Sequence, residues 1–259
     1  MSLNIKYHLN YIDSPFWSFA IHDGHHISSE LSPFLLLTDQ QRLREEDPFT
    51  ATIAELPTNH FFVATSRFQL DLNRNHRDCI YLQPAQAWGL KVYNHLPKKY
   101  IKKLYTEYVH IYELLDEHIK MTIEKFGYFI ILDFHSYNAK RDGQNESMDM
   151  VKNPQINLGT FYNDKKWIRF IADYISFVKN QTLCNSPIDI RENIKFKGGN
   201  LAQHIISNFG DFGCVLSIEF RKDFMDEWSN VSDAIKIEAY KQLMLKTVQY
   251  IKSYFYDDK

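Results

Sequence analysis

The chain has 259 residues, of which 44% are hydrophobic and 15% aromatic, and 30 basic against 32 acidic side chains leave a formal charge of −2. This apolar content supports a folded core and excludes intrinsic disorder. The near-neutral charge provides no electrostatic attraction for nucleic acid or anionic lipid. Three cysteines, none in a Cys-x-x-Cys pair, exclude a disulfide scaffold and a thiolate zinc site.

The first half of the chain predicts short strands followed by a long amphipathic helix. The expected elements are strands at 16–21, 60–66 and 67–72 and helices at 49–56 and 100–126. In the last of these, apolar side chains recur at steps of three and four, which is typical of a helix with one buried face. Gly127 follows it directly and is expected to terminate it.

The second half continues the alternation of strands and helices. The expected elements are strands at 128–134, 156–159, 188–191 and 214–220 and helices at 165–179, 201–209 and 232–254. The segment 128–134 is apolar on both faces, as a central strand should be. The polar segment 139–153 is either a lid or disordered. This rhythm predicts an α/β fold with a mixed sheet, in a single domain over residues 1–259.

The sequence shows no pattern typical of a signal peptide, a membrane span or a nucleotide-binding loop. The N-terminal segment has no basic region followed by an apolar stretch, so we expect no signal peptide and a cytoplasmic protein. The apolar runs are too short to span a bilayer, and we expect neither membrane nor nucleic acid as partner. Nine glycines form no Gly-x-Gly-x-x-Gly or phosphate-binding loop. The oligomeric state is left open.

Polar side chains stand where three predicted strands end. His22 follows the first strand, His135 follows the central strand, and Glu219 lies within the strand at 214–220. In α/β sheets, ligands bind beyond the carboxyl ends of the strands. Two histidines and a carboxylate are the ligand types of a catalytic zinc with an open water position. Hydrogen-bonded structural histidines are the alternative interpretation.

Two further groups of charged residues have both a functional and a structural interpretation. Arg67, Arg74 and Arg77 could form a clamp for an anionic group, because arginine forks bind carboxylates in bidentate fashion. An ordinary surface strand with three arginines would show the same pattern. The acidic run 45–47 precedes Pro48 and, taken alone, favours a solvated helix N-cap over a metal ligand.

Taken together and in this order, these segments resemble the N-formylglutamate amidohydrolase family over about residues 16–222. The segments are the strand into His22-Asp23-Gly24, then Arg44-Glu45-Glu46-Asp47-Pro48-Phe49-Thr50, Ser66-Arg67, Asp71-Leu72-Asn73-Arg74, Asp133-Phe134-His135-Ser136, Leu158-Gly159-Thr160, Lys197-Gly198-Gly199 with His204 five residues beyond, and Ile218-Glu219. The Asp-Leu-Asn-Arg segment followed by Asp-x-His-Ser is their most specific part.

The resemblance implies a fold and a set of residue roles. The fold would be zinc-carboxypeptidase-like, with a mixed sheet of roughly eight strands between helices. One catalytic zinc would be held by His22, His135 and Asp47, with Glu46 as the substitute for Asp47. Glu219 would be the general base, and His204 would steady the oxyanion or the substrate. Asn73 and Arg74 would hold a substrate carboxylate, assisted by Arg67.

The sequence therefore predicts a zinc-dependent amidohydrolase acting on a small N-acylated amino acid with a carboxylate, by default N-formyl-L-glutamate. One alternative is carboxypeptidase-like hydrolysis at acidic peptide ends, and another is a metal-free binding protein with the same fold. The chain departs from the family pattern around the pocket: no proline precedes His22, and Asn200 rather than an aromatic residue follows the glycine pair. These departures leave the acyl group and the amino acid undetermined.

Overall fold

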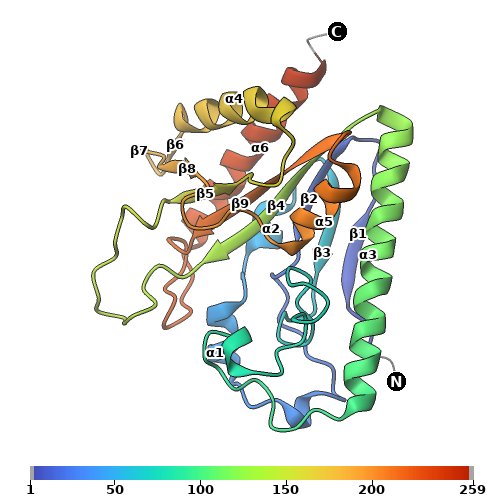
Figure 1. Ribbon diagram of the computed structural model, residues 1–259. Coiled ribbons are helices and arrows are strands. Elements are labelled where there is room, and N and C mark those ends of the chain that lie inside the picture. Colours follow the sequence, from blue (N-terminus) through green and yellow to red (C-terminus); the bar gives the residue numbers. More distant parts are fainter. Residues whose placement is uncertain (1–2, 257–259) are drawn as a thin grey trace.

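A seven-stranded mixed sheet forms the centre of the computed structural model, which describes residues 3–256 (Figure 1). Its strands lie in the order β1 (Tyr7–Asn10), β3 (Asn59–Val63), β2 (Phe16–Ala20), β4 (Phe129–Tyr137), β9 (Gly213–Arg221), β5 (Ile156–Gly159) and β8 (Ile190–Glu192). Neighbours are parallel except at β1–β3 and β9–β5. A separate hairpin joins β6 (Thr182–Leu183) and β7 (Ser186–Pro187). The predicted mixed α/β sheet is confirmed.

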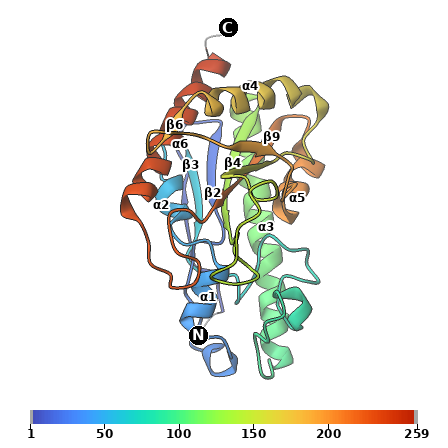
Figure 2. The ribbon, with the colours of Figure 1, turned by 90° about the vertical axis from the view of Figure 1, so that its left-hand side faces the viewer.

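Helices cover both faces of this sheet, which gives a three-layered arrangement (Figure 2). The first face packs on α3 (Lys98–Phe126) and α5 (Asn200–Phe209). The second face packs on α2 (Thr50–Ala54), α4 (Ile168–Lys179) and α6 (Ala234–Tyr256). The remaining helical elements are α1 (Asp39–Glu45) and the single turns η1 (Ser32–Phe34), η2 (Pro84–Gln86) and η3 (Lys165–Trp167). No helix within residues 3–256 is long and apolar enough to cross a bilayer.

The alternation of side chains along β4 and β9 determines which residues can meet. Every residue of both strands is buried. Phe129 and Ile131 belong to the core on the α3 and α5 face, so Asp133 and His135, further along at the same period of two, point to that face as well. The register pairs His135 with Glu219 on the neighbouring strand. Two residues of the predicted site are thus adjacent on one face.

The long helix α3 supports the segment that contains Asn73 and Arg74. Its predicted periodicity and its end are confirmed, since Gly127 adopts the left-handed conformation with φ 78° and its N–H donates to Ile123 O at 2.7 Å. Tyr108 OH donates to Arg74 O at 2.8 Å and Tyr112 OH donates to Leu72 O at 2.7 Å. The helix therefore fixes the backbone of an irregular segment next to the site.

The predicted strand at 67–72 is wrong, and the acidic run 45–47 is not a solvated cap. The backbone at 66–70 forms a turn, with Gln69 N donating to Ser66 O at 2.9 Å. The polar side chains that suggested a solvent face are buried: Arg67 pairs with Asp71 (2.7 Å), and Gln69 accepts from Ser28 N (2.8 Å). All three acidic residues of the run 45–47 are buried as well. Alternation between apolar and polar residues here reflects two buried sides, not one buried and one solvated side.

The sequence-based description missed β1 and α1, as well as the short elements η1, η2, β6 and β7. The helix α1 had a local signal, because Thr38 and Gln41 form a capping box: Gln41 N donates to Thr38 Oγ1 at 3.2 Å, and Thr38 N donates to Gln41 Oε1 at 2.9 Å. This helix ends at Glu45 and so delivers the acidic run to the carboxyl ends of the strands.

Candidate active site and metal centre

The candidate site lies where the strand order reverses. From β2 the chain goes to β3 on one side and later to β4 on the other, so loops leave a crevice beyond the carboxyl ends of β2 and β4. His22 comes two residues after β2 ends, and His135 lies near the end of β4. The fold thus places both predicted histidines at its topological switch point.

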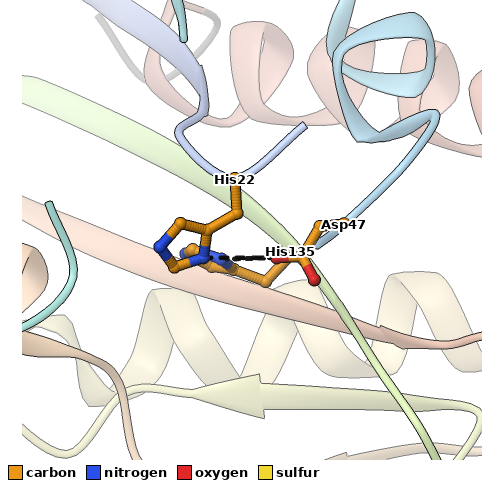
Figure 3. A group of neighbouring side chains, drawn as sticks. All are labelled: His22, Asp47 and His135. Carbon is orange, nitrogen blue, oxygen red and sulfur yellow. Dashed lines mark hydrogen bonds and ion pairs between the residues drawn. The ribbon is translucent and has the colours of Figure 1, made fainter. Parts of the chain in front are cut away.

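His22, Asp47 and His135 converge on one point, as Figure 3 shows. Asp47 Oδ2 lies 3.2 Å from His135 Nδ1 and 3.4 Å from His22 Nδ1. One ligand atom from each residue lies within 4.8 Å of the other two, and all three residues are buried. Two imidazole nitrogens and one carboxylate oxygen are a donor set that zinc prefers. The group could therefore hold a metal ion.

Each histidine is oriented by a second carboxylate on its other ring nitrogen. His22 Nε2 donates to Asp71 Oδ1 at 2.7 Å, and His135 Nε2 lies 3.1 Å from Asp133 Oδ1. Such partners fix the ring and its tautomer, which directs both Nδ1 atoms to the common point. Asp71 is itself held by Arg67 (2.7 Å) and by the hydroxyl of Tyr81.

The charges of this group stabilise one another. Burial acts to raise the pKa of the Asp47 carboxyl, but hydrogen bonds from His135 and His22 outweigh burial and hold this pKa well below its usual range. Burial acts to lower the pKa of His135, but the carboxylates of Asp133 and Asp47 raise it well above the ordinary value. Asp47 is therefore ionised at neutral pH, as a metal ligand must be.

Glu219 faces this group from the neighbouring strand. It pairs in register with His135 and is buried, with 9% of its surface exposed. Burial is the main reason that its pKa is raised to about 8, against the opposing effect of His135. A carboxyl with a raised pKa beside a candidate metal centre is a typical feature of a functional site.

A cavity of about 440 Å³ opens over the group. Its lining consists of His22, Glu45, Asp47, Arg67, Asn73, Arg74, Trp88, His135, Ser136, Tyr137, Asn138, Arg141, Lys195, Phe196, Lys197, Gly198, Gly199, Glu219 and Lys222. The volume lies in the range of pockets for small molecules, roughly 300–1,000 Å³.

Asn73 and Arg74 line the cavity next to the metal-binding group. Asn73 Nδ2 lies 3.4 Å from His135 Nε2, and Asn73 Oδ1 accepts from Leu201 N at 3.1 Å. A Cβ at Gly199 would lie 2.0 Å from this Oδ1, so the close approach requires glycine there. Arg74 is partly exposed, and its Nε lies 3.9 Å from Asp71 Oδ2. Its guanidinium is thus available to a ligand.

Three of the residues considered from the sequence lie elsewhere. Glu46 is buried, but it accepts from Ser66 Oγ and His25 Nδ1 (2.5 Å) and does not line the cavity. His204 Nε2 bonds to Asp116 at 2.8 Å and lines a different surface hollow, between α3 and α5. Arg77 is exposed outside the cavity. The geometry favours Asp47 over Glu46 and leaves His204 outside the group around Glu219.

Several lining residues had not been identified from the sequence, namely Trp88, Arg141, Lys195 and Lys222. Lys222 is buried, and its Nζ donates to Arg44 O (2.6 Å) and Glu46 O (2.7 Å), which steadies the backbone next to Asp47. Burial lowers its pKa to about 8. None of these residues belongs to a periodic pattern or a motif, but the position of Lys222 three residues after Glu219 was a weak signal.

The solved structures that share this fold include the following two. A crystal structure of N-formylglutamate amidohydrolase from Ralstonia eutropha JMP134 has a TM-score of 0.72 and 15% identity, covering 96% of this chain and 98% of that one. A gene product of Agrobacterium tumefaciens has a TM-score of 0.63 and 15% identity, covering 93% and 92%. At this identity the likeness concerns the fold.

The family is shown by the sequence itself. No curated protein matches the chain. The sequence model of the N-formylglutamate amidohydrolase family matches residues 14–225, which is most of the chain and includes every residue of the candidate metal centre together with Glu219. The chain therefore belongs to the N-formylglutamate amidohydrolase family.

Proposed function

We propose that this protein is a zinc-dependent amidohydrolase that cleaves the amide bond of a small N-acylated amino acid, with N-formyl-L-glutamate as the default substrate. The observation that supports this most directly is the convergence of His22, Asp47 and His135 beside the buried Glu219. Family membership supports hydrolysis of a linear amide, and the cavity supports a small-molecule substrate.

The residues fit a catalytic zinc, because they offer three ligands and an open side toward the cavity. When bound, zinc lowers the pKa of a coordinated water to about 7 and polarises a carbonyl oxygen. Asp71 and Asp133 keep the two imidazoles in the ligating orientation. Ser136 Oγ donates to Asp47 Oδ1 at 3.2 Å and so holds the other oxygen of the carboxylate ligand.

Glu219 is the general base of this proposal. In its ionised form, the carboxylate accepts a proton from the attacking water and later delivers it to the leaving nitrogen. Glu219 lies opposite His135 in the register of β4 and β9, and therefore beside the metal ligands.

Asn73 and Arg74 hold the substrate carboxylate. Binding energy from this non-reacting group orients the amide bond relative to Glu219 and the metal ligands. Arg67 contributes indirectly, because its guanidinium is already bound to Asp71 and to Glu45 O (3.2 Å). It keeps Asp71 in place and adds positive charge to the cavity wall.

Replacing Arg74 with alanine should raise KM for carboxylate-bearing substrates about 10-fold to 100-fold, because a charge-assisted pair is lost. Steady-state kinetics on a metal-loaded enzyme measure this. Arg77→Ala is the matched control, since Arg77 is three residues away and exposed outside the cavity. An unchanged KM in Arg74→Ala would remove Arg74 from the clamp.

Replacing Gly199 with alanine should lower kcat/KM by about 100-fold, because the new Cβ would push Asn73 out of position and such a shift of about 1 Å misplaces the substrate. Gly143→Ala is the control, since its Cβ would meet only the Glu146 side chain, at 3.0 Å. Thermal unfolding of both variants separates loss of fold from loss of geometry. Wild-type kinetics in Gly199→Ala would contradict the role given to Asn73.

A carboxypeptidase-like activity on acidic peptide ends is the second candidate, because the cavity is large enough for drug-sized ligands. A panel of N-formyl amino acids and short acidic peptides, run on the metal-loaded enzyme, decides between the two. A strong preference for peptides would overturn the default substrate.

A further inference from the structure

Two tyrosines of α3 bind the backbone of residues 72–74, which we call the clamp segment. Tyr112 OH donates to Leu72 O at 2.7 Å, and Tyr108 OH donates to Arg74 O at 2.8 Å. The clamp segment forms turns and belongs to no helix or strand, so its shape depends on such contacts. Because a carbonyl oxygen can only accept, each hydroxyl must direct its single proton to the clamp segment.

Asn200, the first residue of α5, contacts both hydroxyls. Its Nδ2 donates to Tyr108 OH at 3.1 Å and to Tyr112 OH at 2.8 Å. Since each tyrosine proton is directed to a carbonyl, the two hydroxyl oxygens accept the two protons of this amide nitrogen. Asn200 N also donates to Asn73 O at 3.3 Å, which is the carbonyl between the two that the tyrosines bind. Three successive carbonyls of the clamp segment are thus held by α3 and α5.

These groups lie behind the clamp segment and not in the cavity. Asn200, Tyr108 and Tyr112 border the surface hollow between α3 and α5, and none of the three lines the cavity. The two tyrosines are buried, and their ring centroids are 4.4 Å apart. Burial raises the pKa of Tyr108 to about 12 and holds the pKa of Tyr112 well above its ordinary value. Both hydroxyls are therefore protonated donors at neutral pH.

We propose that Asn200 is a positioning residue that fixes the substrate clamp through the hydroxyls of Tyr108 and Tyr112. The amide orients both hydroxyls, and the hydroxyls hold the carbonyls on either side of the Asn73 peptide unit. This inference rests on the proposed amidohydrolase function, because it concerns the clamp that binds the substrate carboxylate. Since Asn200 lies outside the cavity, its loss should weaken substrate binding and leave the chemical step nearly unchanged.

Replacing Asn200 with aspartate reverses the direction of these hydrogen bonds. An ionised carboxylate can only accept, so it would draw the protons of Tyr108 and Tyr112 away from the clamp segment. In Asn200→Asp, KM for carboxylate-bearing substrates should rise about 10-fold or more, with kcat within about 3-fold of wild type. Asn200→Leu removes the amide but leaves the hydroxyl protons on the carbonyls, so its KM should rise only about 3-fold. Steady-state kinetics on the metal-loaded enzyme measure both.

A purely structural role for Asn200 predicts the opposite order of the two variants. A negative charge in the first turn of a helix is stabilising, so Asn200→Asp should have a Tm at least as high as that of Asn200→Leu. The positioning role nevertheless requires the higher KM in Asn200→Asp. Asn208→Asp is the matched control, because Asn208 is exposed on the same helix and does not line the cavity. A KM in Asn200→Asp no higher than in Asn200→Leu would overturn the inference.

A mutant cycle tests whether Asn200 acts through the tyrosines. The double variant Tyr108→Phe/Tyr112→Phe removes both hydroxyls but keeps both rings, and its KM should rise about 10-fold. Adding Asn200→Asp to this double variant should change KM by less than about 3-fold, because no hydroxyl is left to reorient. Thermal unfolding verifies that each variant is folded. An undiminished effect of Asn200→Asp without the hydroxyls would contradict the proposed connection.

Hydrogen exchange of the full chain keeps the inference separate from the proposed function. Backbone amides of residues 72–76 should exchange about 10-fold faster in Asn200→Asp than in wild type, whereas Asn208→Asp should leave their exchange unchanged. This measurement requires no turnover. Failure of the wild-type protein to hydrolyse any N-acyl amino acid would contradict the proposed function alone. Unchanged exchange of residues 72–76 in Asn200→Asp would overturn the positioning role of Asn200.

Discussion

Replacing Glu219 with glutamine is expected to lower kcat about 100-fold to 10,000-fold, while bound zinc and KM stay close to wild-type values. Glutamine keeps the size of the side chain and its place opposite His135, but it cannot accept a proton from water. Steady-state kinetics combined with metal analysis of the purified variant measure both quantities. Because glutamine carries no charge, burial penalises it less than an ionised carboxylate, and the variant should fold.

The outcome of this substitution separates two roles for Glu219. Loss of zinc together with activity would make Glu219 a metal ligand and reopen the assignment of Asp47. Glu124→Gln provides the control for a carboxylate-to-amide change, because Glu124 is exposed on α3 and does not line the cavity. It should retain wild-type activity.

Replacing His135 with alanine is expected to abolish zinc binding and, with it, activity. The variant removes one of three ligands, and Asp47 loses a partner that keeps it ionised. Zinc at about 100 times its Kd should stabilise the wild-type protein by about 2.7 kcal/mol, or roughly 5–10 °C in Tm. His135→Ala should show no such zinc-dependent shift in thermal unfolding.

The same experiment tests the metal-free binding protein that the sequence left as an alternative. Such a protein would contain no stoichiometric zinc, and His135→Ala would leave its ligand binding unchanged. His110→Ala is the control, since His110 is exposed on α3. A wild-type protein whose Tm is insensitive to zinc and to chelators would count against the metal-dependent mechanism.

Local patterns in the sequence determined most of the secondary structure. The apolar repeat of α3, its end at Gly127 and the apolar run that begins β4 each depend on neighbours within a few residues, and all three were predicted. His22 and His135 were identified for the same reason, because a polar residue at the end of a buried strand is visible in one stretch of sequence. The alternation of apolar and polar residues at 67–72 gave a wrong prediction of a half-exposed strand, since both sides of that segment are buried.

The tertiary structure decided how the predicted residues meet. Glu46 and Asp47 are adjacent in sequence and equally acidic, yet Glu46 turns to Ser66 and His25 while Asp47 faces His22 and His135. His204 lies five residues after Gly199, but the helix α5 directs it to Asp116 on α3. The direction in which a side chain points at a helix end or a turn depends on packing partners that are far away in the chain.

The fold class could be predicted from the sequence, as could the two histidines at the strand ends and the segments that resemble the family. The wall of the cavity was decided by the tertiary structure alone. Trp88, Arg141 and Lys195 come from three separate segments without a shared pattern, and only the folded sheet brings them to one place. Short-range periodicity reports which face of an element is buried, whereas a binding site is built from long-range contacts, and those depend on the whole fold.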